Sequence, residues 1–445
     1  MLMLKTVLGL TALAAGVLSD APQDLGTVLA GNKDLSKFND LIRKYPDVLL
    51  QLPTYGGVTV SDCLPSFAAA AAAATATRPL CIFNATATRV SDFFLANFQI
   101  MAPSNAAIDN IPYTALNGVW DPDNKDATIP LLQYHILQTT VALGGLAAGP
   151  TYFETTLLTS SAYTNVTTGQ GLLVNKQGED TTVVISGQGS RCSVTQTDIP
   201  FKGGLIQIVD NLLIPPSQID KTAQAFGAVS FLGSLYAAKL LPDVAYRKNV
   251  TIFAPAANAY KTVGGTLQGL NATQLARIMN YHIVPDRVLD SKSLVNGTNL
   301  TTLAKDPSGQ ITAQIHVRQD GNSLFVNTAQ IVQPDILLAN GVMHLIGNVL
   351  NPDAEFVTPN PNIATQPPVY ALSTASGAFT TALPCTKDCP VTSTAGDASA
   401  TAAASTTTSA FFSSTSKGLA PRCTAHVAGA AALGMIGLGA GMALM

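Results

Sequence analysis

The sequence predicts an α+β protein built from two copies of one domain. Three short motifs occur twice, in the same order, over the middle of the 445-residue chain. Intervals of about 140–150 residues between the copies indicate duplicated domains, because solenoid repeats are about 20–50 residues long. Strand-like and helix-like segments also follow one another without a steady β-α-β rhythm, which favours α+β over a parallel α/β sheet.

The first elements of each copy are clearest in the second one. The stretch VTIFAP (250–255) alternates and is β-branched, so it predicts a strand that ends at proline. Residues 258–263 then begin a turn or a short helix. In NATQLARIMNYH (271–282), apolar residues and His282 recur at helical spacing, which predicts a helix that Asn271 or Thr273 can cap.

The later elements are strands. IHVRQDGNSLFVN (315–327) has strand-like runs on both sides of Asp-Gly-Asn, which is a hairpin signal. GVMHLIGNVLNP (341–352) predicts a buried strand pair, or a strand and a bulge, around Gly347 and Asn348.

The repeated motifs are an Ala-Pro strand end, a Tyr-His pair, and a glycine followed seven residues later by asparagine. The motif residues are Pro103, Asn105, Tyr134, His135, Gly204 and Asn211 in the first copy, and Pro255, Tyr281, His282, Gly341 and Asn348 in the second. The second copy has Ala257 where the motif of the first copy has Asn105.

This set of motifs resembles the fasciclin domain. The resemblance implies two tandem domains, at 22–217 (with an insertion at about 50–97) and at 222–353. It implies a β-sandwich wedge with packed helices, a role in adhesion or surface contact, and no enzymatic activity. The chain looks like a fasciclin-like surface glycoprotein of the kind that fungi carry. No Arg-Gly-Asp tripeptide is present, so integrin binding is not expected.

Both ends are predicted to be processing signals. Residues 1–19 have one lysine, an apolar run and small residues at the end, as in a signal peptide. Residues 417–445 follow a small-residue site and end in an apolar run, which predicts a removed glycosylphosphatidylinositol (GPI) signal. Ser416 is the candidate attachment residue, with Ser414 and Gly418 as rivals. A tail anchor or a disordered end is the alternative.

Residues 354–416 are rich in Ser, Thr, Pro and Ala, and predict a disordered, O-glycosylated stalk or a bare linker. The two terminal signals place the mature chain outside the cell, where N-glycosylation is expected. The sequons begin at Asn84, Asn165, Asn249, Asn271, Asn296 and Asn299.

The cysteines fit an oxidising compartment only in part. Cys63 and Cys81 are candidates for one disulfide, and Cys385 and Cys389 for another. Cys192 is then left over, so other pairings stay open, and Cys423 leaves with the GPI signal.

Catalytic, metal and nucleic-acid sites are not indicated. No nucleophile elbow or His-Glu-x-x-His spacing occurs, and no cofactor is predicted. The net charge of −3 and the absence of basic runs argue against nucleic-acid binding. His135 and His282 lie on the inward face of a helix, so we interpret them as core histidines bonded to nearby backbone, with ligand contact as the alternative.

Two functions fit these features. The first is a GPI-anchored, extracellular adhesion or matrix-interaction protein, whose partners are extracellular proteins or glycans of the wall or matrix. The second is a structural, carbohydrate-associated cell-wall glycoprotein without a dedicated adhesive ligand. The sequence does not mark one loop as the contact.

Overall fold

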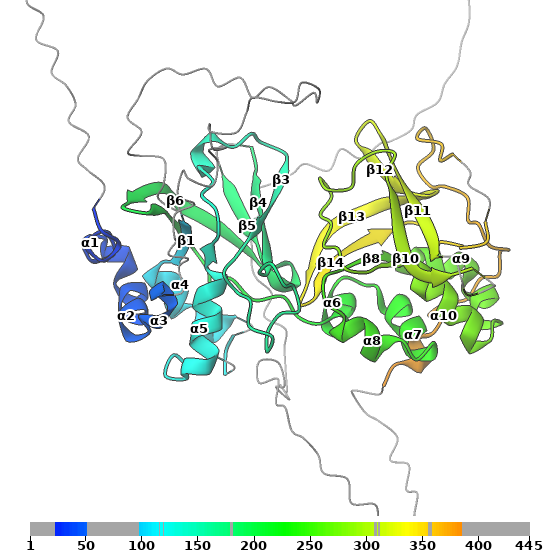
Figure 1. Cartoon of the computed structure of the whole chain (residues 1–445), viewed down its shortest axis with the longest axis horizontal. Helices are drawn as coiled ribbons and strands as arrows, with labels where there is room; N and C mark the ends of the chain where they lie inside the picture. Colours follow the sequence, from blue (N-terminus) through cyan, green and yellow to red (C-terminus); the bar gives the residue numbers. More distant parts are fainter. Residues whose placement is uncertain are drawn as a thin grey trace, which may run out of the picture.

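The structure is a computed structural model in which two lobes lie side by side (Figure 1). It describes residues 23–384, except 51–97 and loop positions 115, 119, 179–180, 307–308, 310–311 and 355–357. Each lobe has one seven-stranded sheet with helices packed at one end.

The first lobe has the strand order β2-β1-β7-β6-β5-β4-β3. The strands are β1 (Phe98–Pro103), β2 (Ile136–Leu137), β3 (Thr151–Thr155), β4 (Gly171–Lys176), β5 (Thr182–Ile185), β6 (Arg191–Phe201) and β7 (Gly204–Val209). β1 and β7 are parallel, and the other neighbours are antiparallel. A bridge between Leu137 and Thr156 joins the two ends of the sheet, so the predicted wedge is one strongly curled sheet.

The helices of the first lobe cover the end of this sheet. They are α1 (Leu25–Gly31), α2 (Ser36–Lys44), α3 (Asp47–Leu50), α4 (Asn105–Asp109) and α5 (Lys125–Tyr134). Phe38 and Ile42 of α2 pack with Ile100 of β1 and Ile206 of β7 in one apolar cluster. The early segment before the 51–97 gap therefore belongs to the core of the first lobe.

The second lobe repeats this plan with the order β10-β11-β12-β13-β14-β8-β9. Its strands are β8 (Val250–Pro255), β9 (Ile283–Val284), β10 (Asn299–Lys305), β11 (Thr312–Asp320), β12 (Ser323–Val326), β13 (Ala329–Leu338) and β14 (Gly341–Ile346). Its helices are α6 (Ile219–Ala225), α7 (Val229–Ala237), α8 (Leu241–Tyr246), α9 (Ala257–Gln268) and α10 (Ala272–Tyr281). The predicted α+β class is confirmed in both lobes.

Local sequence chemistry explains several of these elements. Asn271 caps the start of α10, as one of the two predicted candidates, and Gln274 completes a reciprocal capping box. β11 and β12 form the predicted hairpin, in which Asp320 pairs with Ser323 across the turn. Two expectations need correction. α9 is a full helix rather than a turn or short helix, and 341–352 holds the single strand β14, which pairs in parallel with β8.

The predicted stalk also needs correction, because its first part packs on the second lobe. We call residues 358–384 the strap. The Asn348 side chain donates to Gln366 O at 2.9 Å, and Gly265 N donates to Ser373 O at 2.9 Å. Phe379 is only 7 % exposed within the apolar core, and Figure 1 shows this end of the strap, in orange, beside α7. A few anchor residues and backbone hydrogen bonds therefore order a segment whose average composition predicts disorder.

Several predicted features lie outside the described residues. They are the signal peptide 1–19, the GPI signal 417–445, Ser416, Asn84, Cys63, Cys81, Cys385 and Cys389. Among the helices that the structure does describe, we find none with the length and apolar character needed to span a bilayer.

Candidate functional site

The two Tyr-His motifs form the same buried hydrogen-bond network in each lobe. His282 Nδ1 lies 2.8 Å from Ile278 O, and Nε2 accepts from the backbone N–H of Leu350 at 3.0 Å. His135 repeats these contacts with Leu131 O at 2.7 Å and Leu213 N at 3.0 Å. Since Nε2 accepts, Nδ1 carries the proton and donates to the helix carbonyl. Both are buried core histidines, and Nδ1 bonds nearby helix backbone as interpreted. Nε2 instead ties the helix end to backbone that follows β14 or β7, which is distant in sequence.

Burial makes both histidines hard to protonate, so each lobe is expected to lose stability in mild acid. The pKa of His135 and of His282 is lowered by burial from 6.5 to about 4. Below pH 6.5 the unfolded chain therefore binds more protons than the folded one. The stabilisation is complete above pH 6.5 and is lost as the pH falls towards 4.

We expect the free energy of unfolding at pH 5 to be lower by about 2 kcal/mol for each histidine than at pH 7.5. Urea denaturation at the two pH values measures this. The variant with His135→Phe and His282→Phe serves as control, and its stability should change less over the same range. An equal change in variant and wild type would contradict the assignment.

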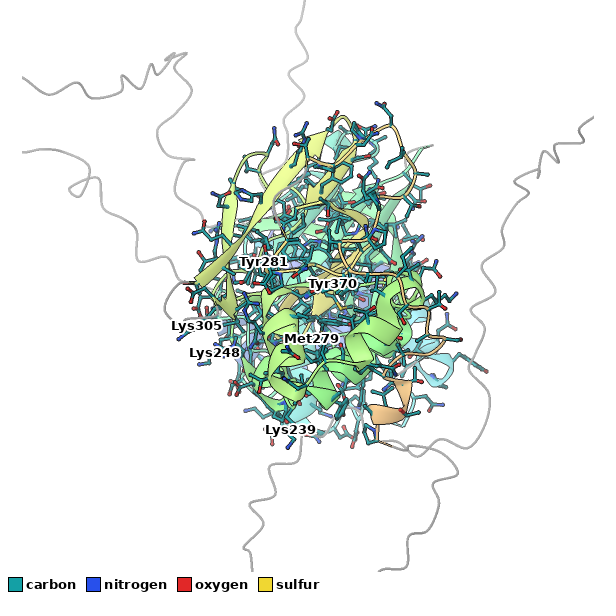
Figure 2. The ribbon with its side chains drawn as sticks, turned by 90° about the vertical axis from the view of Figure 1, so that its right-hand side faces the viewer. Lys239, Lys248, Met279, Tyr281, Lys305 and Tyr370 are labelled. Carbon is teal, nitrogen blue, oxygen red and sulfur yellow. The ribbon has the colours of Figure 1, made fainter. Side chains whose placement is uncertain are left out.

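The other motif residues position backbone. The Tyr134 hydroxyl donates to Gly171 O at 3.0 Å, and that of Tyr281 donates to Gln314 O at 2.8 Å. Figure 2 shows Tyr281 above Met279, towards the strands of the second lobe. Pro103 and Pro255 are the last residues of β1 and β8. The motif tyrosines and prolines therefore act on backbone of the sheet in both lobes.

The asparagines of the motif differ between the lobes. Asn105 accepts from Lys37 N at 2.9 Å and donates to Lys33 O at 2.8 Å, which fixes the start of α2. The second lobe has Ala257 at that place. Asn211 Oδ1 accepts from its neighbour Leu212 N, whereas Asn348 holds the strap.

The two lobes meet in a junction of hydrogen bonds and apolar contacts. Thr164 Oγ1 donates to Ala339 O at 3.0 Å, and Gln170 Nε2 donates to Leu338 O at 3.0 Å. Beside them, Leu173 of the first lobe packs with Leu337 and Val342 of the second. These buried contacts hold the lobes in one orientation.

A groove of about 420 Å³ opens at this junction and is lined by both lobes. The lining residues are Tyr152, Phe153, Glu154, Thr155, Val166 and Thr168 from the first lobe, and Val288, Asp290, Lys292 and Ser293 from the second. Lys292 Nζ lies 3.4 Å from the centre of the Tyr152 ring. Burial raises the pKa of Glu154, which accepts a hydrogen bond from Thr139 at 3.1 Å.

The composition of the groove suits recognition of a partner group. It combines aromatic and apolar side chains with carboxylates, hydroxyls and one ammonium, which is the composition of a binding surface. Within the described part of the chain, no three His, Cys, Asp or Glu residues are close enough to hold a metal ion. The sequence had not indicated this groove, since its residues come from segments of two lobes and share no motif.

Five of the six predicted sequons fall within the described residues, and so does Cys192. Asn271, Asn296 and Asn299 are exposed on the second lobe, whereas Asn165 and Asn249 lie at the junction and are partly buried. Cys192 is a buried free thiol whose pKa burial raises to about 12, so it is not activated as a nucleophile.

Comparison with known proteins identifies the domain type. The model of the family described as "Fasciclin domain" matches residues 81–215 and 227–352, which is more than half of the chain. The chain belongs to the fasciclin family. The match to the second fasciclin domain ends at 352, before the strap begins.

Fungal proteins are among the relatives of this fasciclin-domain chain. It is 31 % identical to a fasciclin-like arabinogalactan protein of Arthroderma benhamiae over 219 residues, which cover 49 % of this chain and 50 % of that one. It is 31 % identical over 267 residues to another from Cercospora beticola, covering 59 % and 69 %. A solved fasciclin-domain pair of the insect cell adhesion molecule fasciclin I aligns with 72 % of this chain and 98 % of its own, with 16 % identity and a TM-score of 0.31.

Proposed function

We propose that this protein is a non-enzymatic, GPI-anchored extracellular glycoprotein that mediates adhesion or matrix contact through its two fasciclin domains. The observation that carries the proposal is the junction, where two family domains are held as one body with a shared groove. The predicted signal peptide and GPI signal support the location. The partners are extracellular proteins or glycans of the wall or matrix, and no nucleic acid is involved.

A fixed pair of domains favours contact with a partner. Because the junction already orders both sides of the groove, binding does not have to order them, and less affinity is lost to entropy. Many copies tethered on one surface then add weak contacts into firm attachment.

Replacing both Tyr152 and Lys292 by alanine is expected to weaken attachment. These residues contact each other from opposite lobes, so the double variant removes the aromatic and the cationic part of the groove. Loss of such a central contact costs about 2 kcal/mol, or about thirtyfold in affinity. The measurement is attachment of producing cells to one another and to coated surfaces, at matched surface amounts of protein.

Lys305→Ala is the matched control, since Lys305 is exposed on the far side of the second lobe (Figure 2). It should attach like wild type. If deleting the whole protein lowers attachment but the groove variant does not, the contact lies elsewhere. If deletion leaves attachment unchanged under several conditions, adhesion itself is wrong.

A structural cell-wall role without a dedicated ligand is the second candidate. It is favoured by the Ser/Thr-rich sequence beyond the strap, which is suited to carry dense glycans. Treatment with a phospholipase that cuts GPI separates the two roles. Release from the surface supports a lipid-tethered adhesion protein, and retention in the wall after treatment supports the structural role.

A further inference from the structure

Two sequons from different domains face each other at the junction. They are Asn165-Val166-Thr167 in the first domain and Asn249-Val250-Thr251 in the second. The backbone N–H of Thr167 donates to Asn249 Oδ1 at 2.9 Å, and Asn249 Nδ2 donates to Thr167 Oγ1 at 2.8 Å. Asn165 adds bonds from its N–H to Ala339 O at 2.8 Å and from its Nδ2 to Tyr246 O at 3.3 Å. We call this set of contacts the sequon clasp.

Asn249 Nδ2 carries two hydrogens, and the geometry of the amide determines which of them is donated to Thr167. Oδ1 and Nδ2 both bind Thr167, so the donated hydrogen is the one on the same side of the C–N bond as Oδ1. An N-linked glycan turns this group into a planar secondary amide, which strongly prefers the trans form. In that form the first sugar carbon takes the place of that same hydrogen. A glycan on Asn249 therefore occupies the position of Thr167.

We propose that a glycan on Asn249 and the closed domain junction exclude each other. Asn249 then serves either as part of the sequon clasp or as a glycan carrier, and modification at this position sets whether the two fasciclin domains act as one body. The inference rests on the proposed passage through a glycosylating, secretory compartment.

The second sequon is also closed to modification once the domain has folded. Thr251 is fully buried in β8, where its hydroxyl donates to Arg287 O at 2.8 Å and accepts from Leu289 N at 2.9 Å. A glycosylating enzyme has to reach this hydroxyl and the asparagine together. The choice between clasp and glycan is thus made before β8 joins its sheet.

The exposed sequons of the second domain give the contrast. Asn271 uses its side-chain oxygen to accept from Gln274 N, and Asn296 uses its own to accept from Gln319 N. A glycan on Nδ2 of either residue leaves those bonds in place. These positions should carry glycans without any effect on the junction.

Opening the clasp has a direct consequence for the groove. Val166 and Thr168, which flank Thr167, line the groove on the side of the first domain, and Lys292 lines it from the second. Separation of the domains splits this lining into two halves. It also exposes the apolar contact of Leu173 with Leu337 and Val342.

The test combines glycan mapping with hydrogen exchange on the full secreted chain. Site occupancy is read from intact glycopeptides, and backbone exchange is followed in the segments around Asn165–Thr167 and Asn249, whose amides bond across the junction. The same chain made without N-glycosylation is the unmodified reference. Asn249→Ala is the reference for loss of the side-chain bonds of Asn249, and Asn271→Gln is the matched control for loss of an exposed glycan.

We expect slow exchange in chains that lack the Asn249 glycan. Chains that carry this glycan should exchange fast, at the rate of Asn249→Ala. A secreted chain wholly unmodified at Asn249 and slow in exchange also agrees. Slow exchange in chains that carry the Asn249 glycan overturns the proposal, as does fast exchange in the unmodified reference. If no sequon carries a glycan, the proposed secretory route fails, while the exchange of the unmodified chain still tests the clasp.

Discussion

Gly341→Ala is expected to unfold the second domain while leaving the first one folded. A Cβ at Gly341 would lie 1.8 Å from the carbonyl oxygen of Val250 and 2.8 Å from its carbon. These are backbone atoms of β8, which pairs in parallel with β14 at this position, so no side chain can rotate away. We expect a loss of about 4 kcal/mol or more, the range of severe core substitutions.

Urea unfolding followed by circular dichroism and by fluorescence separates the two domains. Trp120 is the only tryptophan of the chain and lies in the first domain, so its fluorescence should keep the wild-type transition. Gly347→Ala is the matched control, because a Cβ there meets its nearest atoms at 3.7 Å, an ordinary contact. A variant at Gly341 as stable as this control would contradict the close approach. Gly204→Ala should reverse the pattern, since its Cβ would lie 1.8 Å from Phe98 O.

His282→Ala is expected to destabilise the second domain by about 3 kcal/mol and to lower the secreted amount. The change leaves the buried N–H of Leu350 and the carbonyl of Ile278 without their partner and opens a cavity beneath Phe231. Thermal unfolding and the yield of secreted protein measure the effect.

His282→Phe separates the two causes, because it fills the space and still removes both hydrogen bonds. It should recover the part of the loss that comes from the cavity and no more. His135→Ala is the matched change in the first domain, and there the tryptophan signal should move. Normal stability of His282→Ala together with lost partner binding would show that the histidine contacts a ligand instead.

Much of each domain could be predicted from sequence because its signals are local. The helix cap at Asn271, the turn after Asp320 and the helical stripe that ends at His282 all act within a few residues. The duplication also predicted that equivalent residues of the two copies take equivalent places in their sheets. The motif glycines Gly204 and Gly341 occupy the same position in their sheets. Gly204 lies opposite Phe98, and Gly341 lies opposite Val250.

The remaining features depend on contacts that leave no local pattern. Glycines of α7 and α9 leave room for the strap to approach these helices closely. A Cβ at Gly233, for example, would meet Phe379 O at 2.1 Å. Nothing near Phe379 in the sequence indicates that distant partner. The groove likewise needs Tyr152 and Lys292, which only the orientation of the two domains brings together.

The strap also determines how the protein responds to a pulling force. Tension from the C-terminal side enters the second domain at the end of the strap, on α7 and α9, and not at β14. The strap bonds the backbone of α9 through Ser373 and Ala375, and beyond them Phe379 is anchored in the apolar core. If the proposed anchor pulls on the C-terminal side, the strap detaches from α7 and α9 before force reaches a strand of the sheet.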